Sequence, residues 1–307
     1  MVKFIIQRLI QAIPTVIFVS MLVFLMLYLI PGDPAEIFIG DRQSTPEQLE
    51  VIRERMGLNR PIHVQYFDYM VNALQGDFGT SLSSRRPVLD EILIRLPSTL
   101  ELTLTALGLS IVVGIGLGVI AAVKHNTIID SIAMVIALIG ISMPVYWSSL
   151  LLIILLSVQL RWLPTVGQGT LSHLIMPALA LGFLSAGSLA RMVRSSMLDV
   201  LHQDYVRTAY AKGIANRAVI YKHALRNALI PVVTIIGLTF GQLLGGAVLT
   251  ETIFSRLGIG RMYVQAVLNK DFTLVQGTTL FIATAYVMIN IFIDLIYVYL
   301  DPRIRYD

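Results

Sequence analysis

The sequence predicts an all-α integral membrane protein with six transmembrane helices and a small helical extracytoplasmic segment after the first helix. Of its 307 residues, 56% are hydrophobic and 14% charged, and mean hydropathy is +0.76. An ordinary soluble domain has about 25% charged residues. Six apolar runs reach the length of about 20 residues that a helix needs to cross a bilayer. With so few charges, the net charge of +4 bears on membrane orientation and not on nucleic-acid binding.

The six apolar runs define the predicted membrane crossings. The first run follows Lys3 and Arg8 but is too long for a signal peptide and is followed by PGDP, so a retained helix is expected. The third run is longer than needed and contains Pro144, which predicts a kink or tilt. The runs cover approximately residues 9–30, 102–123, 131–160, 171–190, 228–250 and 272–300.

Basic residues predict the orientation. Seven lysines and arginines lie between Arg191 and Arg226, whereas the short loop after the third run has only Arg161. Lysine and arginine mark the cytoplasmic side of a membrane, so both termini and this basic segment are expected in the cytoplasm.

Residues 31–97 are then expected outside, as a folded cap. Thr45 followed by Pro46 and Gln48 is a helix-start pattern, and Gly57 is expected to end that helix. A second amphipathic stretch covers about residues 62–74 and is closed by Gly76.

Catalytic and metal-binding motifs are missing from the sequence. It has no GxxxxGK phosphate loop, no HExxH and no cysteine, and its five histidines are scattered. No enzymatic activity, cofactor or metal site is therefore expected for this chain.

Glycines indicate how the helices pack. Gly237, Gly241 and Gly245 recur every four residues and predict close approach between helices. Lining of a substrate path is the alternative to simple packing, and the same two alternatives apply to Gly114, Gly116 and Gly118.

Two acidic residues are candidates for a gate or path. Asp294 lies within the last apolar run, where a charge is expensive and is usually paired or functional. Structural pairing is the favoured role. Glu251 closes the fifth run at the outer surface, where an ordinary helix-end charge is the alternative.

The basic segment is predicted to form a helix-turn-helix. One short helix runs from Tyr205 to Lys212, Gly213 breaks it, and Asn216 can cap a second helix that leads into the fifth span. Small residues beside the turn fit a partner's groove. A basic loop that only enforces topology or touches anionic lipid is the equally weighted alternative.

The segment resembles the glycine-centred EAA loop of ABC importer permeases, in the version of the dipeptide, oligopeptide, glutathione and nickel family. The resemblance is carried by RSSMLDVLHQDYVRTAYAKG and HALRNALIPVV, with LIPGDP, GDFGTS, LPSTLELT and ETIFSRLGIGRM elsewhere. The usual triplet here reads Arg207, Thr208 and Ala209, so its first glutamate is an arginine and no acidic contact is assigned. The chain is similar to the B-type subunit, which has a large outer segment.

The resemblance implies a type I ABC importer permease fold and a coupling loop at residues 195–227 that docks on an ATPase. Its expected partners are a second homologous permease, two cytoplasmic ATPases that hold ATP and Mg, and an extracytoplasmic binding protein. The expected layout is a transmembrane helix at 1–30, the cap at 31–97, a five-helix core at 98–300 and a cytoplasmic tail at 301–307. The residues expected in the coupling loop are Tyr205, Arg207, Thr208, Ala209, Ala211, Lys212, Gly213, His223 and Arg226.

The resemblance also implies the cargo and the membrane. A di- or oligopeptide is expected, imported across a bacterial or archaeal cytoplasmic membrane, with glutathione or a nickel chelate as alternatives. An ion-coupled secondary transporter is the alternative from another class. That class requires membrane-embedded charge, and Asp294 fits it only loosely.

Overall fold

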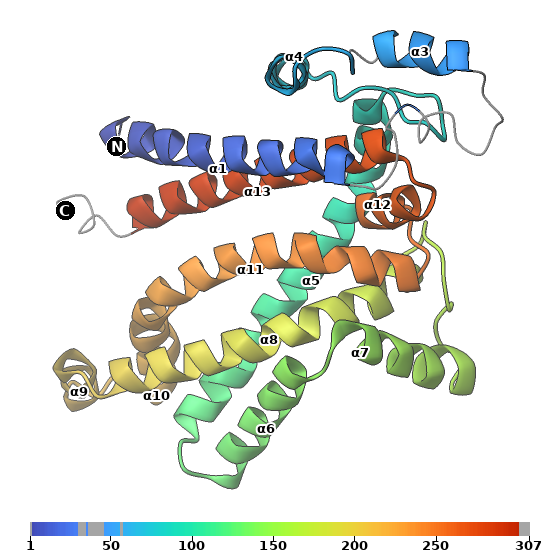
Figure 1. The fold of residues 1–307 in the computed structure, drawn as a ribbon. Coiled ribbons are helices and arrows are strands. Elements are labelled where there is room, and N and C mark those ends of the chain that lie inside the picture. The colour runs from blue at the N-terminus through green and yellow to red at the C-terminus, as the bar shows by residue number, and fades with distance from the viewer. Residues whose placement is uncertain (1, 30–34, 36–45, 56–57, 301–307) are drawn as a thin grey trace. The chain divides into compact units, whose positions relative to one another are not determined.

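The computed structural model describes residues 2–29, 35, 46–55 and 58–300 (Figure 1). Within these residues the structure is helical apart from one isolated β-bridge between Thr80 and Pro87, which confirms the all-α prediction. The elements, with π-helical segments written η, are α1 (Val2–Leu29), α3 (Pro46–Arg55), α4 (Ile62–Leu74), α5 (Val88–Val123), α6 (Ile128–Ser142), α7 (Val145–Leu152), η1 (Ile153–Gln159), α8 (Ser172–Leu201), α9 (Asp204–Ala211), α10 (Asn216–Ala218), η2 (Val219–Ala224), α11 (Leu225–Ile253), α12 (Ile259–Leu268) and α13 (Phe272–Leu300).

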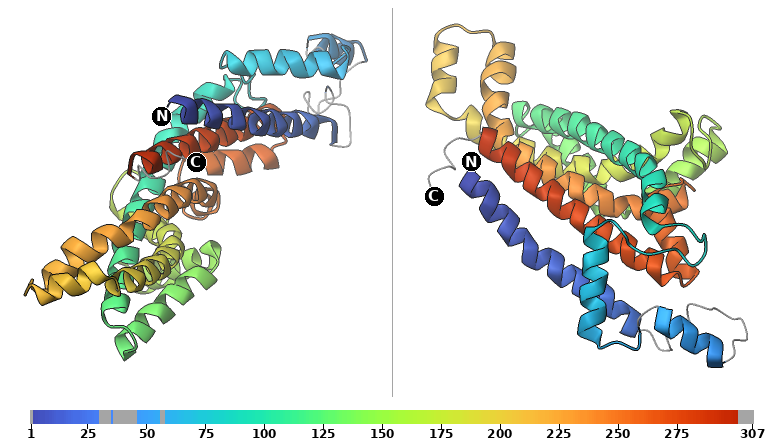
Figure 2. Two further views of the ribbon diagram at one scale, coloured as in Figure 1. Left: turned by 90° about the vertical axis from the view of Figure 1, so that its left-hand side faces the viewer. Right: turned by 90° about the horizontal axis from the view of Figure 1, so that it is seen from above.

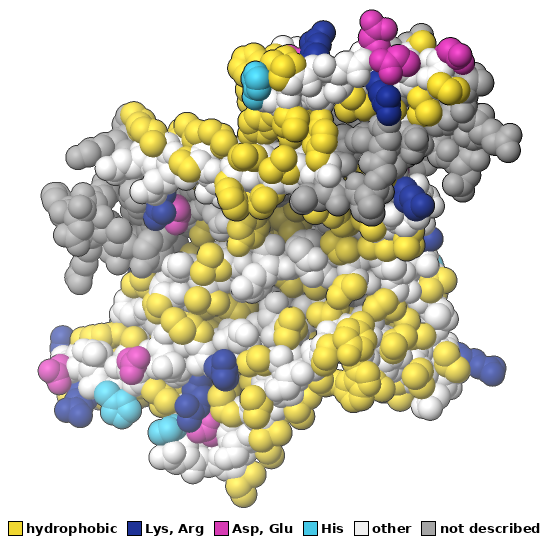
Figure 3. Space-filling model, in the orientation of Figure 1, with side chains coloured by type: hydrophobic (Ala, Val, Ile, Leu, Met, Phe, Trp, Pro, Cys, Tyr) yellow, Lys and Arg dark blue, Asp and Glu magenta, His cyan; other side chains and the backbone are white. Residues whose placement is uncertain are grey.

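Five helical stretches in the described part of the chain are long and apolar enough to cross a membrane. They are Ile6–Met26, Val88–Val123, Ser172–Leu201, Asn216–Ile253 and Phe272–Leu295. Hydrophobic side chains cover much of the face shown in Figure 3. On α6, Ile132, Val135 and Leu138 are exposed. Apolar side chains that face outward along a whole helix are what a surrounding bilayer requires.

The third predicted run is broken instead of merely kinked. Ile128–Ser142 and Val145–Gln159 meet at an angle of 107°. Met143 has an extended backbone (φ −84°, ψ 122°), because a residue that precedes a proline avoids the helical conformation. Pro144 then occupies the N-cap position of α7, which begins at Val145.

The two halves together are long and apolar enough to be a candidate for one further membrane crossing. At one end, Asp130 of α6 forms an ion pair with Arg194 near the end of α8, at 2.7 Å. At the other end, Leu152 and Ile153 pack against a buried cluster that includes Met176 and Ala180 near the start of α8. Met176 and Arg194 lie about 27 Å apart along a straight helix. The bent pair therefore runs along α8 between these two contacts, and counting it as one broken span gives six candidate crossings, the predicted number.

α5 and α8 extend well beyond their apolar runs. α5 begins at Val88, well before residue 102, and its first turn carries Asp90 and Glu91, which suit the positive end of a helix dipole. α8 continues to Leu201, beyond residue 190. Arg191 and Arg194 are therefore on a helix, although a loop was expected there.

Two compact units make up the chain, and the first comprises residues 98–261 with the chain from 292 onward. Its core lies between α5, α6, α8 and α11, and close approach depends on glycine. A Cβ atom on Gly118 would lie 2.6 Å from Cβ of Val193, and one on Gly187 would lie 2.3 Å from the backbone oxygen of Ala137. Small residues permit such contacts between membrane helices.

The second unit comprises residues 2–97 and 262–291. α1 runs beside α13 (Figure 2), and the amide of Gln276 donates a hydrogen bond to the backbone oxygen of Val23 at 3.0 Å. The hydroxyls of Ser20 and Tyr66 join α1 to α4 at 2.8 Å. Asp271, just before α13, is buried and accepts hydrogen bonds from Ser81 and Ser83.

The helices expected in the 31–97 segment are present. α3 begins at Pro46 as predicted, while the expected capping Thr45 and terminating Gly57 lie outside the described residues. α4 has the predicted bounds, and Gly76 follows it with φ +84°.

Candidate functional site

A helix-turn-helix links the end of α8 to the start of α11 and projects beyond both (Figures 1 and 2). Val206 and Ala209 on α9 and Val219 on η2 form a buried cluster, against which Leu201 of α8 packs. This buried apolar face packs α9 against the end of α8.

The turn between α9 and α10 depends on a left-handed residue. Gly213 has φ +73°, a conformation that residues with a Cβ atom rarely adopt. Its backbone nitrogen donates to the oxygen of Tyr210 at 2.9 Å. The expected Asn216 cap is wrong, because α10 starts at Asn216 with Ala215 in the capping position. The Asn216 side chain instead accepts a hydrogen bond from the Tyr210 hydroxyl at 2.8 Å.

The outward face of α9 is solvent-exposed, and its side chains make few interactions with the rest of the described chain. Arg207, Ala211 and Lys212 are exposed. The Arg207 guanidinium lies 3.9 Å from the Asp204 carboxylate, with side chains 73% and 99% exposed, so this pair contributes little stability. Thr208 only donates to the backbone oxygen of Asp204. These side chains are therefore free to contact a partner.

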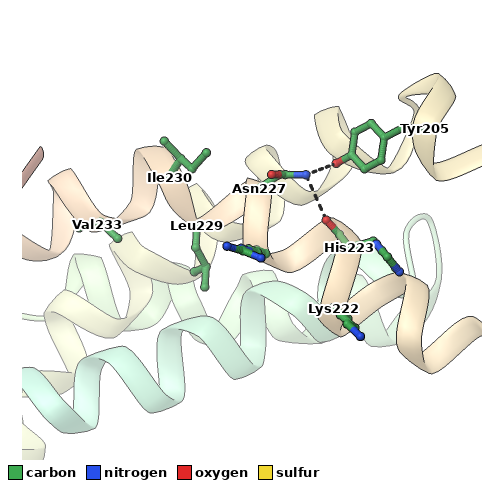
Figure 4. Close-up of a pocket in the computed structure, with 8 residues that line it drawn as sticks. Tyr205, Lys222, His223, Asn227, Leu229, Ile230 and Val233 are labelled. Atoms are coloured by element: carbon green, nitrogen blue, oxygen red, sulfur yellow. Dashed lines mark hydrogen bonds between the residues drawn. The ribbon is translucent and has the colours of Figure 1, made fainter. Parts of the chain in front are cut away.

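Three of the other expected residues gather around a cavity of about 580 Å³ (Figure 4). The Asn227 amide donates to the Tyr205 hydroxyl at 2.8 Å and to the His223 backbone oxygen at 3.2 Å. The polar and basic residues around the cavity are Tyr205, Lys222, His223, Arg226 and Asn227, and the apolar ones are Leu229, Ile230 and Val233. The segment thus has two distinct surfaces, the outside of α9 and this cavity.

Glu251 lies far from that segment, at the end of α11, and is fully buried, not an exposed helix-end charge. Its carboxylate accepts a hydrogen bond from the Thr99 hydroxyl at 2.6 Å and from the backbone nitrogens of Gly260 at 2.8 Å and Arg261 at 3.2 Å. It therefore caps the first turn of α12.

Arg256 is buried beside this carboxylate. Its side chain is 1% exposed and donates to Glu101 at 2.7 Å, while its Nε atom has no hydrogen-bond partner among the described residues. The loop between α11 and α12 is thus held by a buried arginine whose partner, Glu101, is 55% exposed, and loss of that partner would leave the buried charge uncompensated.

Polar side chains that the sequence interpretation missed lie between α7, α8 and α11. They line a small cavity of about 90 Å³ and include Ser185 and Ser188 on α8 and Thr239 and Gln242 on α11. Ser188 and Gln242 are exposed although both lie within membrane-spanning stretches. Their spacing of three residues within apolar runs was the signal that could have revealed them.

The three glycines expected to form one packing stripe on α11 do not share the same surroundings. A Cβ atom on Gly237 would lie 2.4 Å from Ile293 of α13, and Gly241 is buried. Gly245 is exposed, with no atom of the described residues within 4 Å of its Cβ position. Four residues turn a helix by about 400°, so the stripe drifts about 40° at each step. Asp294 is half-buried on α13 and takes part in a polar or electrostatic interaction.

Comparison with known proteins places these features in a family. Residues 114–306 match the binding-protein-dependent transport system inner membrane component, and residues 1–103 match the N-terminal part of the same kind of membrane component. The dipeptide transport system permease protein DppB of Alkalihalophilus pseudofirmus is 42% identical, with 100% of both chains covered. The glutathione transport system permease protein GsiC of Escherichia coli K12 is 44% identical, again over 100% of both chains.

The chain belongs to the binding-protein-dependent transport permeases.

Solved structures agree on the fold of this permease. The inward-facing MetNI methionine ABC transporter matches with a TM-score of 0.56 and 19% identity over 68% of this chain and 96% of that one. An amino acid ABC transporter matches with a TM-score of 0.51 and 16% identity over 70% and 94%. At these identities the likeness concerns fold alone.

Membership confirms the expected class. The permease is an inner-membrane, multi-pass subunit of an ABC importer of the peptide and glutathione family, and it is not itself the ATPase. A binding-protein-dependent system implies ATPase and binding-protein partners. Among the described residues, no group of three or more His, Cys, Asp or Glu could hold a metal ion. The family indicates no cofactor for this chain.

Proposed function

We propose that this permease imports di- or oligopeptides, using ATP hydrolysed by partner subunits. The relatives of 42% and 44% identity are named for dipeptide and for glutathione, which is itself a tripeptide. A peptide backbone is thus common to both named cargoes, and this shared chemistry carries the proposal. Glutathione is the second candidate because of the 44% relative. Neither relative favours a nickel chelate.

Residues 195–227 are proposed to dock on an ATPase in the cytoplasm. The outward face of α9 offers Arg207 and Lys212 to a groove, and the buried cluster on its inner face joins it to α8. A push on α9 would therefore reach α8 directly and α11 through η2. The seven basic residues between Arg191 and Arg226 support a cytoplasmic position for this segment and for both termini.

The transport path is proposed to lie along α8 and α11, closed by a second, similar permease. Ser188, Gln242 and Gly245 are exposed within membrane-spanning stretches of this chain. Polar side chains at this depth are expected to face water or protein, because lipid cannot form hydrogen bonds with them. A wet path bounded by a second permease satisfies them.

ATP-driven uptake by the reconstituted transporter tests this proposal. The complete complex, with both permeases, the ATPases and the binding protein, is placed in vesicles, and labelled dipeptide uptake is measured with and without ATP. Uptake should require ATP and be inhibited by unlabelled oligopeptides. If only glutathione is imported, the dipeptide assignment is wrong. Uptake driven by an ion gradient without ATP would overturn the importer mechanism itself.

A further inference from the structure

We propose that the cavity beside α9 binds an anionic phospholipid, with its phosphate at the basic end and its acyl chain along α11. The cavity volume of about 580 Å³ falls within the range of about 300–1,000 Å³ that is typical of small-ligand sites. Its lining divides into a basic, hydrogen-bonding part and an apolar part, which a phospholipid would match at the boundary between headgroup and chain.

The basic part of the cavity lacks a counter-charge. Lys222, His223 and Arg226 line it, and none of them forms an ion pair or side-chain hydrogen bond with any residue in the part of the chain that the structure describes. Two cationic side chains and one imidazole thus line one open space. A phosphate could accept hydrogen bonds from all of them.

A neutral donor is held beside these cations. The Asn227 amide donates to the oxygen of the Tyr205 hydroxyl at 2.8 Å, and Figure 4 shows the two side chains pointing toward each other. Because that oxygen accepts the amide proton, the phenol O–H remains available to donate. The Asn227 amide is itself fixed by the His223 backbone oxygen at 3.2 Å.

The apolar part determines which anion fits. Leu229, Ile230 and Val233 follow the basic residues along α11, and the distance from Arg226 to Val233 along the helix axis is about 10 Å. Leu229 and Val233 are half-buried and Ile230 is exposed, so an apolar strip leads from the cations into the membrane-spanning stretch. Free phosphate or an acidic peptide would leave this strip unused, whereas an acyl chain would cover it.

The inference rests on the proposed function in one respect only, which is that the lipid comes from the cytoplasmic leaflet. Anionic lipids give that leaflet a negative surface potential that attracts basic residues close to the membrane. Binding at the cavity itself does not depend on the cargo. Peptide uptake that persists without selective lipid binding would therefore overturn this inference alone.

Native mass spectrometry of the complete transporter provides the test. The complex is titrated with phosphatidylglycerol or with phosphatidylcholine that has the same acyl chains. A Lys222→Gln/Arg226→Gln permease should bind phosphatidylglycerol about 25-fold more weakly, because each basic residue near the membrane contributes about fivefold. The matched control, Arg191→Gln/Arg217→Gln, removes the same charge from two exposed positions that do not line the cavity, and should keep the wild-type affinity.

Soluble competitors distinguish the sources of the anion. Inorganic phosphate and glycerol phosphate should not displace phosphatidylglycerol, because they lack the acyl chain. Displacement by either one, equal retention of both lipids, or equal losses in the two double variants would overturn the proposal. If the cavity variant does not assemble, a photoactivatable phosphatidylglycerol is used on the wild-type complex. Crosslinks should then map to residues 222–233, and crosslinks confined to other segments would contradict the assignment.

Discussion

The carboxylate of Glu251, at the end of α11, accepts a 2.6 Å hydrogen bond from the hydroxyl of Thr99 on α5, 152 positions earlier in the chain. Its other oxygen accepts from the backbone nitrogen of Gly260 at 2.8 Å. A single side chain therefore joins α5, α11 and the first turn of α12. The Thr99 oxygen in turn accepts from the backbone nitrogen of Ile259 at 2.9 Å, so the donors and acceptors form one connected network.

Removal of the Glu251 carboxylate is expected to destabilise the permease. Glu251→Gln can keep some of these hydrogen bonds and should lower the free energy of unfolding by about 1–3 kcal/mol. Glu251→Ala leaves all the groups that donate to this carboxylate without their acceptor, so it should lower the free energy of unfolding further. The temperature at which the purified protein aggregates measures both losses. Glu47→Gln on the exposed α3 surface is the matched control. An unchanged melting temperature in Glu251→Ala would show that the network carries no stability.

A pH dependence is expected from Asp271. Burial raises the pKa of this carboxyl, but hydrogen bonds from Ser81 and Ser83 outweigh burial, so its pKa lies below the ordinary value of 3.8. The unfolded state therefore binds a proton first as the pH falls. The stabilising contribution is complete well above pH 3.8 and decreases as the pH falls through the folded-state pKa.

Asp271→Asn tests this dependence. The variant should be less stable than wild type at pH 7, and the difference should shrink between about pH 5 and pH 3, because protonation of this carboxyl in the unfolded wild type favours unfolding there. Chemical unfolding of both proteins in detergent at each pH measures the difference in their free energies of unfolding. A difference that stays constant down to pH 3 would mean that the ionised carboxylate has no advantage over a neutral side chain.

Close packing of α6 against α8 should depend on Gly187. Its added Cβ atom would meet the backbone oxygen of Ala137 at 2.3 Å, and a backbone atom cannot rotate away. Gly187→Ala should therefore destabilise the fold by about 1–3 kcal/mol through overpacking. Gly116→Ala is the control, since no described atom lies within 4 Å of its Cβ position, and it should be neutral or slightly stabilising. Equal melting temperatures for the two variants would contradict this packing argument.

Helix ends and the broken third span show what the sequence could and could not predict. Long apolar runs predict where lipid surrounds the chain, and they located the five candidate spans and the bent pair. They do not predict where hydrogen bonding of the helix backbone stops, so the start of α5 at Val88 and the end of α8 at Leu201 were missed. Pro144 predicted a disturbance, but the 107° angle depends on how both halves pack along α8, which no local pattern encodes.

At the candidate sites, predictions that depend on adjacent residues were confirmed, whereas predictions for side chains that have other partners in the fold were wrong. Gly213 was expected at a turn, and its φ of +73° agrees, because a left-handed turn is a property of a few adjacent residues. Glu251 was placed at the surface because the sequence does not reveal that Thr99 lies beside it. Asn216 was expected to cap a helix, but a competing partner, the Tyr210 hydroxyl, accounts for its side chain.

The turn at Gly213 offers a test of docking on an ATPase that separates strain from contact. Every residue with a Cβ atom is strained at φ +73°, by roughly 1 kcal/mol, although asparagine tolerates this conformation best. Within this chain the Cβ position is open, with no described atom within 4 Å. A bulky side chain therefore meets no obstacle in the permease itself, and any additional effect must come from a partner.

Gly213→Trp and Gly213→Asn are the pair to compare. Both variants should insert into the membrane. Their free energies of unfolding should differ by no more than about 1 kcal/mol, since the site is exposed in this chain. In the complete transporter, Gly213→Trp should lower ATPase recovery and substrate-stimulated ATP hydrolysis far more than Gly213→Asn, because only the indole is too large for a groove that fits the turn. Equal hydrolysis in the two variants would place the ATPase away from this turn, whereas a loss confined to Gly213→Trp would show that the partner contacts it directly.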